Sequence, residues 1–271
     1  MFGFSMRGIG FIRARLEEVI SFDYQDLFVH YWSSLQFERD ERTTRVFSAS
    51  LHTYFHVSQS QDLPVIGIVG GIGSGKSSVP RKLAERRSLA IIDADGIGHE
   101  LLNESVVKHE IKTEFGSAVF QADGSVDRPA LAAVVFGGTS KHEDAREALN
   151  SILHPRIRKE IHRRINEAKQ SANVEAIILD AALLLESGWH KDCNLVVFVD
   201  VPRQIRQQRV IENRGWMAEE LAKRELNQLP LEEKKARSNR VIDNGGSLEA
   251  AAEALECILN ALLSDLNAVQ N

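Results

Sequence analysis

From Leu63 onward, short apolar runs rich in valine, isoleucine and leucine alternate with longer stretches whose apolar residues recur at helical spacing. The short runs predict buried strands, and the stretches between them predict helices. The predicted strands are 64–69, 89–92, 175–179, 195–199 and 240–242. Strands that alternate with helices pair in parallel, so the pattern predicts an α/β fold with a mostly parallel five-stranded sheet.

One interval is too long to be a single crossover between strands. Residues 96–170 show helical patterns at 128–136, 142–153 and 155–169 but no convincing strand. Pro155 suits the first position of a helix. We therefore predict an inserted helical subdomain over 96–170. A second polar stretch, 206–235, is rich in arginine and glutamate and predicts a mobile lid.

The first 62 residues differ in composition from the rest of the chain. They hold 12 of its 18 aromatic residues and six arginines, whereas the first lysine of the chain is Lys76. This shift predicts a boundary near residue 62. Three interpretations of 1–62 stay open: an extension upstream of the true start, a docking or oligomerisation arm, or a targeting segment.

The overall composition narrows the class of protein. The net charge is −5, with 26% charged residues, which argues against a nucleic-acid binder that works through bulk positive charge. No apolar run is long enough to predict a membrane span. Two cysteines without metal-like spacing, Cys193 and Cys257, predict reduced, buried or half-buried thiols in a cytoplasmic protein.

The most specific motif is Gly70 to Ser77, which reads G-G-I-G-S-G-K-S and lies between a predicted strand and a predicted helix. The spacing G-x-x-x-x-G-K-[ST] predicts a phosphate-binding loop whose backbone N–H groups hold a polyphosphate. We expect a nucleoside triphosphate here, with Lys76 at the terminal phosphates and the Ser77 hydroxyl on Mg²⁺. The predicted nucleotide contacts are Gly71, Ile72, Gly73, Ser74, Gly75, Lys76, Ser77 and Ser78.

Carboxylates follow two of the predicted strands, where ligands bind in open α/β sheets. Asp95 suits the carboxylate that orients an attacking hydroxyl and accepts its proton. Asp93 and Asp180 are candidate Mg²⁺ ligands, directly or through water. The alternatives are that Asp93 caps the following helix, that Asp95 is a first-turn carboxylate and that Asp180 belongs to a turn.

The predicted lid contributes candidate cations for the transferring phosphoryl group. They are Arg209, Arg214 and Arg224. For each one singly, a place on a solvated helix face is the alternative. In a small kinase, the helical insert is the place where the acceptor substrate would lie.

Several motifs in this order resemble the dephospho-CoA kinase family, from about Val65 to Leu255. The loop is similar to the family's T-G-G-I-x-S-G-K-S-T, and 92–95 matches its I-D-A-D. Residues 152–158 resemble I-L-H-P-x-I-R, and 241–244 match the family's tail. Residues 95–99 and 180–189 look closer to the kinase half of the animal bifunctional CoA synthase. The resemblance implies a P-loop NTPase core.

The resemblance also implies an activity: transfer of the γ-phosphate of ATP to the ribose 3′-hydroxyl of dephospho-CoA, the last step of CoA synthesis. Carried over by position, Asp95 would be the base, and His99, His154 and Arg158 would belong to the acceptor region. The chain departs from the family at His99, where bacterial members usually have arginine. It also carries Asn213-Arg214 where the family has Arg-Asp.

Two other functions remain to be weighed against a kinase of dephospho-CoA. One is another P-loop small-molecule kinase, and the other is a catalytically weakened nucleotide-binding regulatory protein. A GTPase switch is disfavoured because no Asn-Lys-x-Asp motif occurs in the chain. We expect a small-molecule substrate, no nucleic-acid or membrane partner, and a monomer or weak homo-oligomer.

Overall fold

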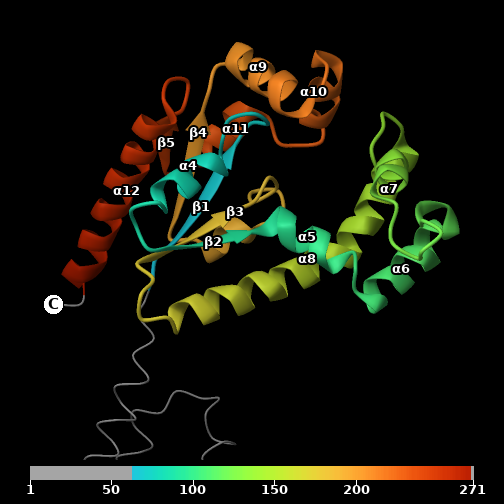
Figure 1. The fold of residues 1–271 in the computed structure, drawn as a ribbon, viewed down its shortest axis with the longest axis horizontal. Coiled ribbons are helices and arrows are strands. Elements are labelled where there is room, and N and C mark those ends of the chain that lie inside the picture. Colours follow the sequence, from blue (N-terminus) through green and yellow to red (C-terminus); the bar gives the residue numbers. More distant parts are fainter. Residues whose placement is uncertain (1–62, 270–271) are drawn as a thin grey trace, which may run out of the picture. The chain divides into compact units, whose positions relative to one another are not determined.

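The computed structural model describes residues 63–269, so the predictions for 1–62 lie outside the described residues. Five parallel strands form one sheet in the order β2-β3-β1-β4-β5 (Figure 1). The strands are β1 (Val65–Gly70), β2 (Leu89–Asp93), β3 (Ala176–Asp180), β4 (Leu195–Asp200) and β5 (Arg240–Asp243). All five predicted strands are confirmed, each within one residue.

Helices cover both faces of the sheet, which explains why its strands read as continuous apolar runs. On β1, Ile66 and Ile68 point to one face, where they pack in a core with α4 (Ser78–Leu83) and α12 (Leu248–Val269). Val65 and Val69 point to the other face, toward α5 (Ala94–Leu101) and α8 (Ser140–Lys169). The sheet is therefore buried between two helical layers.

The insert between β2 and β3 is helical, as predicted. Between α5 and α8 it contains α6 (Ser105–Phe115), the short 3₁₀ helix η1 (Ser117–Val119) and α7 (Arg128–Val135). These elements enclose a core of their own, centred on buried residues such as Val107, Ile111 and Leu131. The insert thus has its own packing while α5 and α8 connect it to the sheet (Figure 1).

The prediction that Pro155 begins a separate helix is wrong. Residues 140–169 form one helix, α8, with Pro155 inside it. A proline there removes one backbone hydrogen bond, but the apolar stripe of Ile157, Ile161 and Ile165 packs against the core beyond it. The Arg156 guanidinium donates to the Ile152 carbonyl at 2.6 Å, which binds a carbonyl of the interrupted turn. Packing on both sides of the proline therefore outweighs the lost bond.

The predicted lid, 206–235, contains most of α9 (Arg203–Arg214), all of α10 (Ala218–Glu225) and most of α11 (Leu231–Ala236). Its last part is fixed to the core through Lys234, whose side chain is fully buried. The Lys234 ammonium donates to the Ala182 carbonyl and to Gln228, both at 3.0 Å, and pairs with Glu186 at 3.0 Å. A lid movement would therefore involve the residues before α11.

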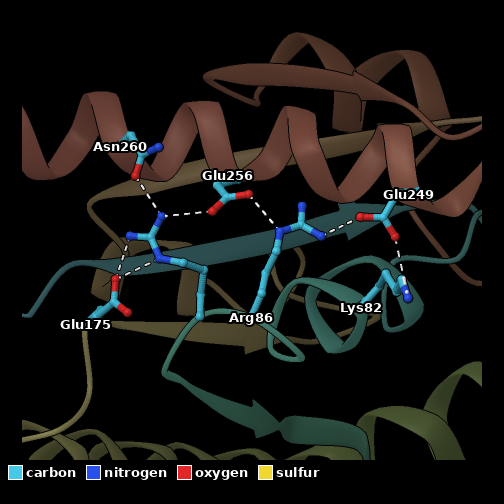
Figure 2. A network of polar contacts seen from close by, with 7 residues as sticks. Lys82, Arg86, Glu175, Glu249, Glu256 and Asn260 are labelled. Carbon is cyan, nitrogen blue, oxygen red and sulfur yellow. Dashed lines mark hydrogen bonds and ion pairs between the residues drawn. The ribbon is translucent and has the colours of Figure 1, made fainter.

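A network of charged side chains ties α12 to the residues that follow the phosphate loop (Figure 2). Arg86 pairs with Glu249 at 2.5 Å and with Glu256 at 2.8 Å, and Lys82 pairs with Glu249 at 3.5 Å. Arg87 bridges Glu175, Glu256 and Asn260. These contacts fix the C-terminal helix against α4 and the start of β3. Within residues 63–269, no helix is long and apolar enough to cross a membrane.

Candidate active site

The phosphate-binding loop connects the end of β1 to the start of α4. Gly73 and Gly75 both have φ +80°, a conformation that glycine adopts without strain. A methyl group at Gly73 would lie 2.6 Å from the Arg206 carbonyl oxygen, and one at Gly75 would lie 2.5 Å from Asn244 Nδ2. Both glycines are therefore required by backbone conformation and by close packing, so the conformation of the loop depends on them.

The donor set of the loop fits a polyphosphate and Mg²⁺. Ser77 is the N-cap residue of α4, yet its side chain makes no capping hydrogen bond, which leaves its hydroxyl free for a ligand. Asp180, at the end of β3, offers a carboxylate that is 1% exposed. A hydroxyl and a carboxylate are hard oxygen ligands of the type that Mg²⁺ prefers. The site thus fits the metal and nucleotide expected from the sequence.

One ammonium joins the two carboxylates of the site. Lys76 Nζ lies 2.8 Å from Asp180 Oδ1 and 3.7 Å from Asp95 Oδ2. Asp180 and Asp93 are paired in register at the ends of β3 and β2, and Asp95 lies in the first turn of α5. The parallel sheet therefore brings Lys76, Asp95 and Asp180 together, as the sequence predicted.

The pKa of Asp95 is raised above its usual value. The largest cause is desolvation by the surrounding protein, and the negative charges of Asp180 and Asp93 also raise the pKa. The Lys76 ammonium and a hydrogen bond from the Ala182 N–H act in the opposite direction. The side chain of Asp95 is still 49% exposed, so a substrate hydroxyl can reach it. A reachable carboxylate with a raised pKa suits a proton acceptor.

Asp93 makes the helix-capping contact that was the alternative to metal binding. Its Oδ1 accepts a hydrogen bond from Gly96 N at 2.9 Å, which caps α5. Its Oδ2 lies 3.8 Å from Arg81 Nη2. Asp93 therefore fixes the helix turn that carries Asp95, and its role as a Mg²⁺ ligand remains a prediction.

Two buried residues that the sequence analysis did not identify as site residues donate hydrogen bonds to backbone carbonyls of the loop. Asn244, 2% exposed and just after β5, donates from Nδ2 to the Ser74 carbonyl at 2.7 Å. Arg206, 4% exposed, donates to the Ile72 carbonyl at 3.1 Å. The position of Asn244 just after the last predicted strand could have indicated that it lies near the loop, because ligands bind at the carboxyl ends of such strands. The sequence offered no signal that distinguishes Arg206 from the other arginines of the predicted lid.

The three predicted lid arginines occupy two different places. Arg209 lies near the loop, where its Nη2 donates to the Asn244 carbonyl at 2.9 Å. Arg214 and Arg224 instead stack on the Trp216 ring, 4.9 Å and 3.9 Å from its centroid. Of the three, Arg209 is placed to reach a phosphate group beside the loop, and the other two are held on Trp216.

The predicted acceptor residues lie on the insert and on the long helix α8. His99 Nε2 is 2.8 Å from Arg128 Nη2, and Arg158 pairs with Asp192 at 3.3 Å. The His154 ring meets Trp189 edge-on at 5.5 Å between centroids. Burial lowers the pKa of His154, which favours its neutral form. Each residue thus has a protein partner, and their contacts with an acceptor remain predictions.

Together, these groups can bind a polyphosphate, hold Mg²⁺ and take a proton from a hydroxyl. Asp180 and Ser77 provide oxygen ligands, Lys76 provides a cation, and Asp95 provides a proton acceptor. This combination suits phosphoryl transfer from a nucleoside triphosphate to an alcohol. It lacks a second carboxylate directly after Asp180, since the next residue is Ala181.

Comparisons with known proteins agree with this chemistry. The family model for dephospho-CoA kinase matches residues 64–250. The dephospho-CoA kinase of Symbiobacterium thermophilum is 39% identical over 198 residues, which cover 73% of this chain and 80% of that protein. That of Carboxydothermus hydrogenoformans is 38% identical over 198 residues, 73% of this chain and 93% of that protein. A solved structure from Thermus thermophilus has a TM-score of 0.62 and 32% identity, covering 74% of this chain and 98% of that one.

Proposed function

Because the chain belongs to the dephospho-CoA kinase family, we propose that its active site transfers the γ-phosphoryl group of Mg-ATP to the ribose 3′-hydroxyl of dephospho-CoA. ATP-dependent phosphorylation of dephospho-CoA, a step of CoA biosynthesis, is the activity of the family. The observation that carries the residue assignments is the contact of Lys76 with both Asp180 and Asp95 beside the phosphate loop.

Asp95 acts on the acceptor hydroxyl. Its carboxylate accepts the proton of the 3′-hydroxyl while the oxygen forms a bond to the γ-phosphorus. The bond between the γ-phosphorus and the β,γ-bridging oxygen breaks, so ADP leaves with the electron pair. The raised pKa of Asp95 increases its basicity at neutral pH, which favours this proton transfer.

Lys76 and the loop act on the donor. The loop N–H groups and the Lys76 ammonium neutralise charge on the phosphates, so the hydroxyl meets a less negative phosphorus. To do so, Lys76 moves its ammonium from Asp180 toward the phosphates. Ser77 and Asp180 would hold Mg²⁺, which when bound spreads the phosphate charge further. Arg209 is the lid cation that lies nearest the loop among the three proposed.

The insert positions the acceptor. His99 and His154 lie on α5 and α8, the two helices that join the insert to the sheet, and Arg158 lies one turn beyond His154. Binding of the acceptor's nucleotide and pantetheine parts to this surface would align the hydroxyl with Asp95. Cys193 is half-buried as predicted, whereas Cys257 is exposed, so the predicted burial of Cys257 is wrong. The two free cysteines fit the cytoplasm that we propose as the compartment, with a monomer or weak homo-oligomer as the working form.

A coupled ADP-release assay on the full chain tests the proposal. With Mg-ATP, dephospho-CoA is compared with adenosine and gluconate, and the product is identified by mass spectrometry. We expect rapid ADP release with dephospho-CoA alone and CoA as the product. Equal or faster turnover with gluconate would overturn the substrate assignment in favour of another small-molecule kinase. ATP binding without turnover of any acceptor would favour a nucleotide-binding regulatory protein.

A further inference from the structure

A buried arginine lies between the predicted lid and the phosphate loop. Arg206, on α9, is only 4% exposed. Its Nη1 donates to the Ile72 carbonyl at 3.1 Å and also pairs with Glu225, the last residue of α10. Its Nε has no hydrogen-bond partner in the described structure. One guanidinium thus connects the backbone of the loop to the end of a lid helix.

The packing of Arg206 on the loop is equally close. A methyl group at Gly71 would lie 2.9 Å from Arg206 Nη1, and the Arg206 backbone carbonyl closes the space beside Gly73. Both the side chain and the backbone of Arg206 therefore contact the segment that is to receive the phosphates. A shift of Arg206 would therefore displace the loop as well, because close-packed groups transmit displacement.

A cavity lies beside the contact between Arg206 and Glu225, on the side of the predicted lid. A cavity of about 270 Å³ borders Gly71, Ile72, Arg206 and Glu225, with the exposed Arg203 on its rim. Glu225 is 25% exposed at the side of this cavity. The residue before it, Arg224, stacks on Trp216. The end of α10 is therefore held by two arginine contacts and faces space into which it can move.

We propose that Arg206 is a positioning residue that couples the predicted lid to the phosphate loop. While Glu225 binds the guanidinium, Arg206 holds the Ile72 carbonyl and fixes the loop in the conformation that binds nucleotide. Without Glu225, the buried cation loses its counter-ion and turns toward water or the cavity, which releases the Ile72 carbonyl. The inference rests on the proposed function for its reaction, but the nucleotide-binding effect does not require the acceptor.

The test compares Arg206→Gln, Arg206→Lys and Glu225→Gln with the unchanged full chain. Arg203→Gln is the matched control, because Arg203 borders the same cavity and makes no ion pair within the described part of the chain. The dissociation constant of Mg-ATP is measured by calorimetry without acceptor. The KM values for ATP and dephospho-CoA and the kcat are then measured in the coupled assay.

We expect Arg206→Gln to weaken Mg-ATP binding and raise the KM for ATP about tenfold, as for loss of a hydrogen bond to a charged group. Glu225→Gln and Arg206→Lys should show smaller shifts in the same direction, and Arg203→Gln none. The double variant Arg206→Gln with Glu225→Gln should be no worse than Arg206→Gln, because both act through one contact.

A merely structural role gives a different result. A smaller folded fraction would lower the apparent kcat and leave both KM values unchanged. Unchanged Mg-ATP affinity in Glu225→Gln and Arg206→Lys would overturn the proposal, even if Arg206→Gln fails to fold. If the unchanged chain does not phosphorylate dephospho-CoA but the variants still lose Mg-ATP affinity, the proposed function fails and the coupling stands.

Discussion

The Lys76 ammonium lies 2.8 Å from the Asp180 carboxylate, which is almost fully buried at the end of β3. Charges in such a place need a partner, because leaving a buried carboxylate unpaired is unfavourable. In the structure Lys76 is that partner. The same lysine is the predicted contact of the terminal phosphates, so we expect it to contribute both to folding and to nucleotide binding.

Replacing Lys76 by methionine should therefore lower stability as well as turnover. We expect Lys76→Met to lower the free energy of unfolding by about 3 kcal/mol, the lower range for breaking a buried pair, since Lys76 is partly exposed. The additional change Asp180→Asn should restore most of this loss by removing the unpaired charge. Urea unfolding at neutral pH measures both. Simple addition of the two single effects would contradict the pairing.

Asp95→Asn tests the proton acceptor. We expect kcat to fall at least about a hundredfold with little change in Mg-ATP affinity, because the amide cannot take the proton. The pKa of Asp95 is raised, so the activity of the unchanged chain should decline as pH falls through a value above the usual 3.9 or so. Asp95→Asn should lack this acidic limb. A kcat near that of the unchanged chain would remove Asp95 from the chemistry.

Glu160 gives stability a defined dependence on pH. Hydrogen bonds from Arg163 and then Arg164, opposed by desolvation, lower the pKa of Glu160 to about 2. A carboxyl with a lowered pKa stabilises the fold when ionised, so its contribution is complete above the unfolded value near 4.5 and is lost as pH falls through about 2. Because solvent screens these partly exposed charges, the contribution of Glu160 to the free energy of unfolding is limited to about 1 kcal/mol. Glu160→Gln should therefore be less stable than the unchanged chain at pH 7.

The difference in the free energy of unfolding between Glu160→Gln and the unchanged chain should shrink as pH falls from about 4.5 to about 2, which chemical unfolding at a series of pH values can measure. Glu167→Gln is a control on the same helix, because Glu167 pairs only with the exposed Arg163 in the described structure. A difference that persists unchanged at pH 2 would mean that packing, rather than charge, accounts for the effect.

Arg87→Met tests the network between α12 and the sheet. Arg87 is 18% exposed and bridges Glu175, Glu256 and Asn260. Its loss should lower the free energy of unfolding by about 1 kcal/mol, and less at high salt. Arg203→Met is the control, because Arg203 is exposed and has no ion pair among residues 63–269. Equal Tm values for the two variants would mean that the network contributes nothing measurable.

The sequence predicted the parts of the site that follow from strand order and motif spacing. Lys76, Asp95 and Asp180 meet because the carboxyl ends of neighbouring parallel strands share one edge of the sheet. The prediction that a helix begins at Pro155 was wrong. Local propensity favours a helix start at proline, whereas packing of α8 on both sides of Pro155 continues the helix. Only the three-dimensional approach of α9 to the loop distinguishes Arg206 from the other arginines.

The lid shows the same limit of sequence reasoning, and it leads to the last prediction. The spacing of Arg209, Arg214 and Arg224 did not reveal that two of them stack on Trp216 while Arg209 binds the Asn244 carbonyl beside the loop. Removal of a cation that faces the phosphates lowers transition-state stabilisation strongly. We therefore expect Arg209→Met to lower kcat/KM for ATP about a hundredfold, and Arg224→Met less than about tenfold.

Trp216 provides an independent measurement of the lid arginines. If Arg214 and Arg224 stay stacked on the ring, its fluorescence changes little when Mg-ATP and dephospho-CoA bind, and Arg209 remains the main lid cation. A large emission change together with a hundredfold loss in Arg224→Met would contradict the ranking, because it would show that the stack opens and that its arginines reach the phosphates. The double variant Trp32→Phe with Trp189→Phe leaves Trp216 as the single tryptophan of the sequence, so the emission reports on Trp216 alone.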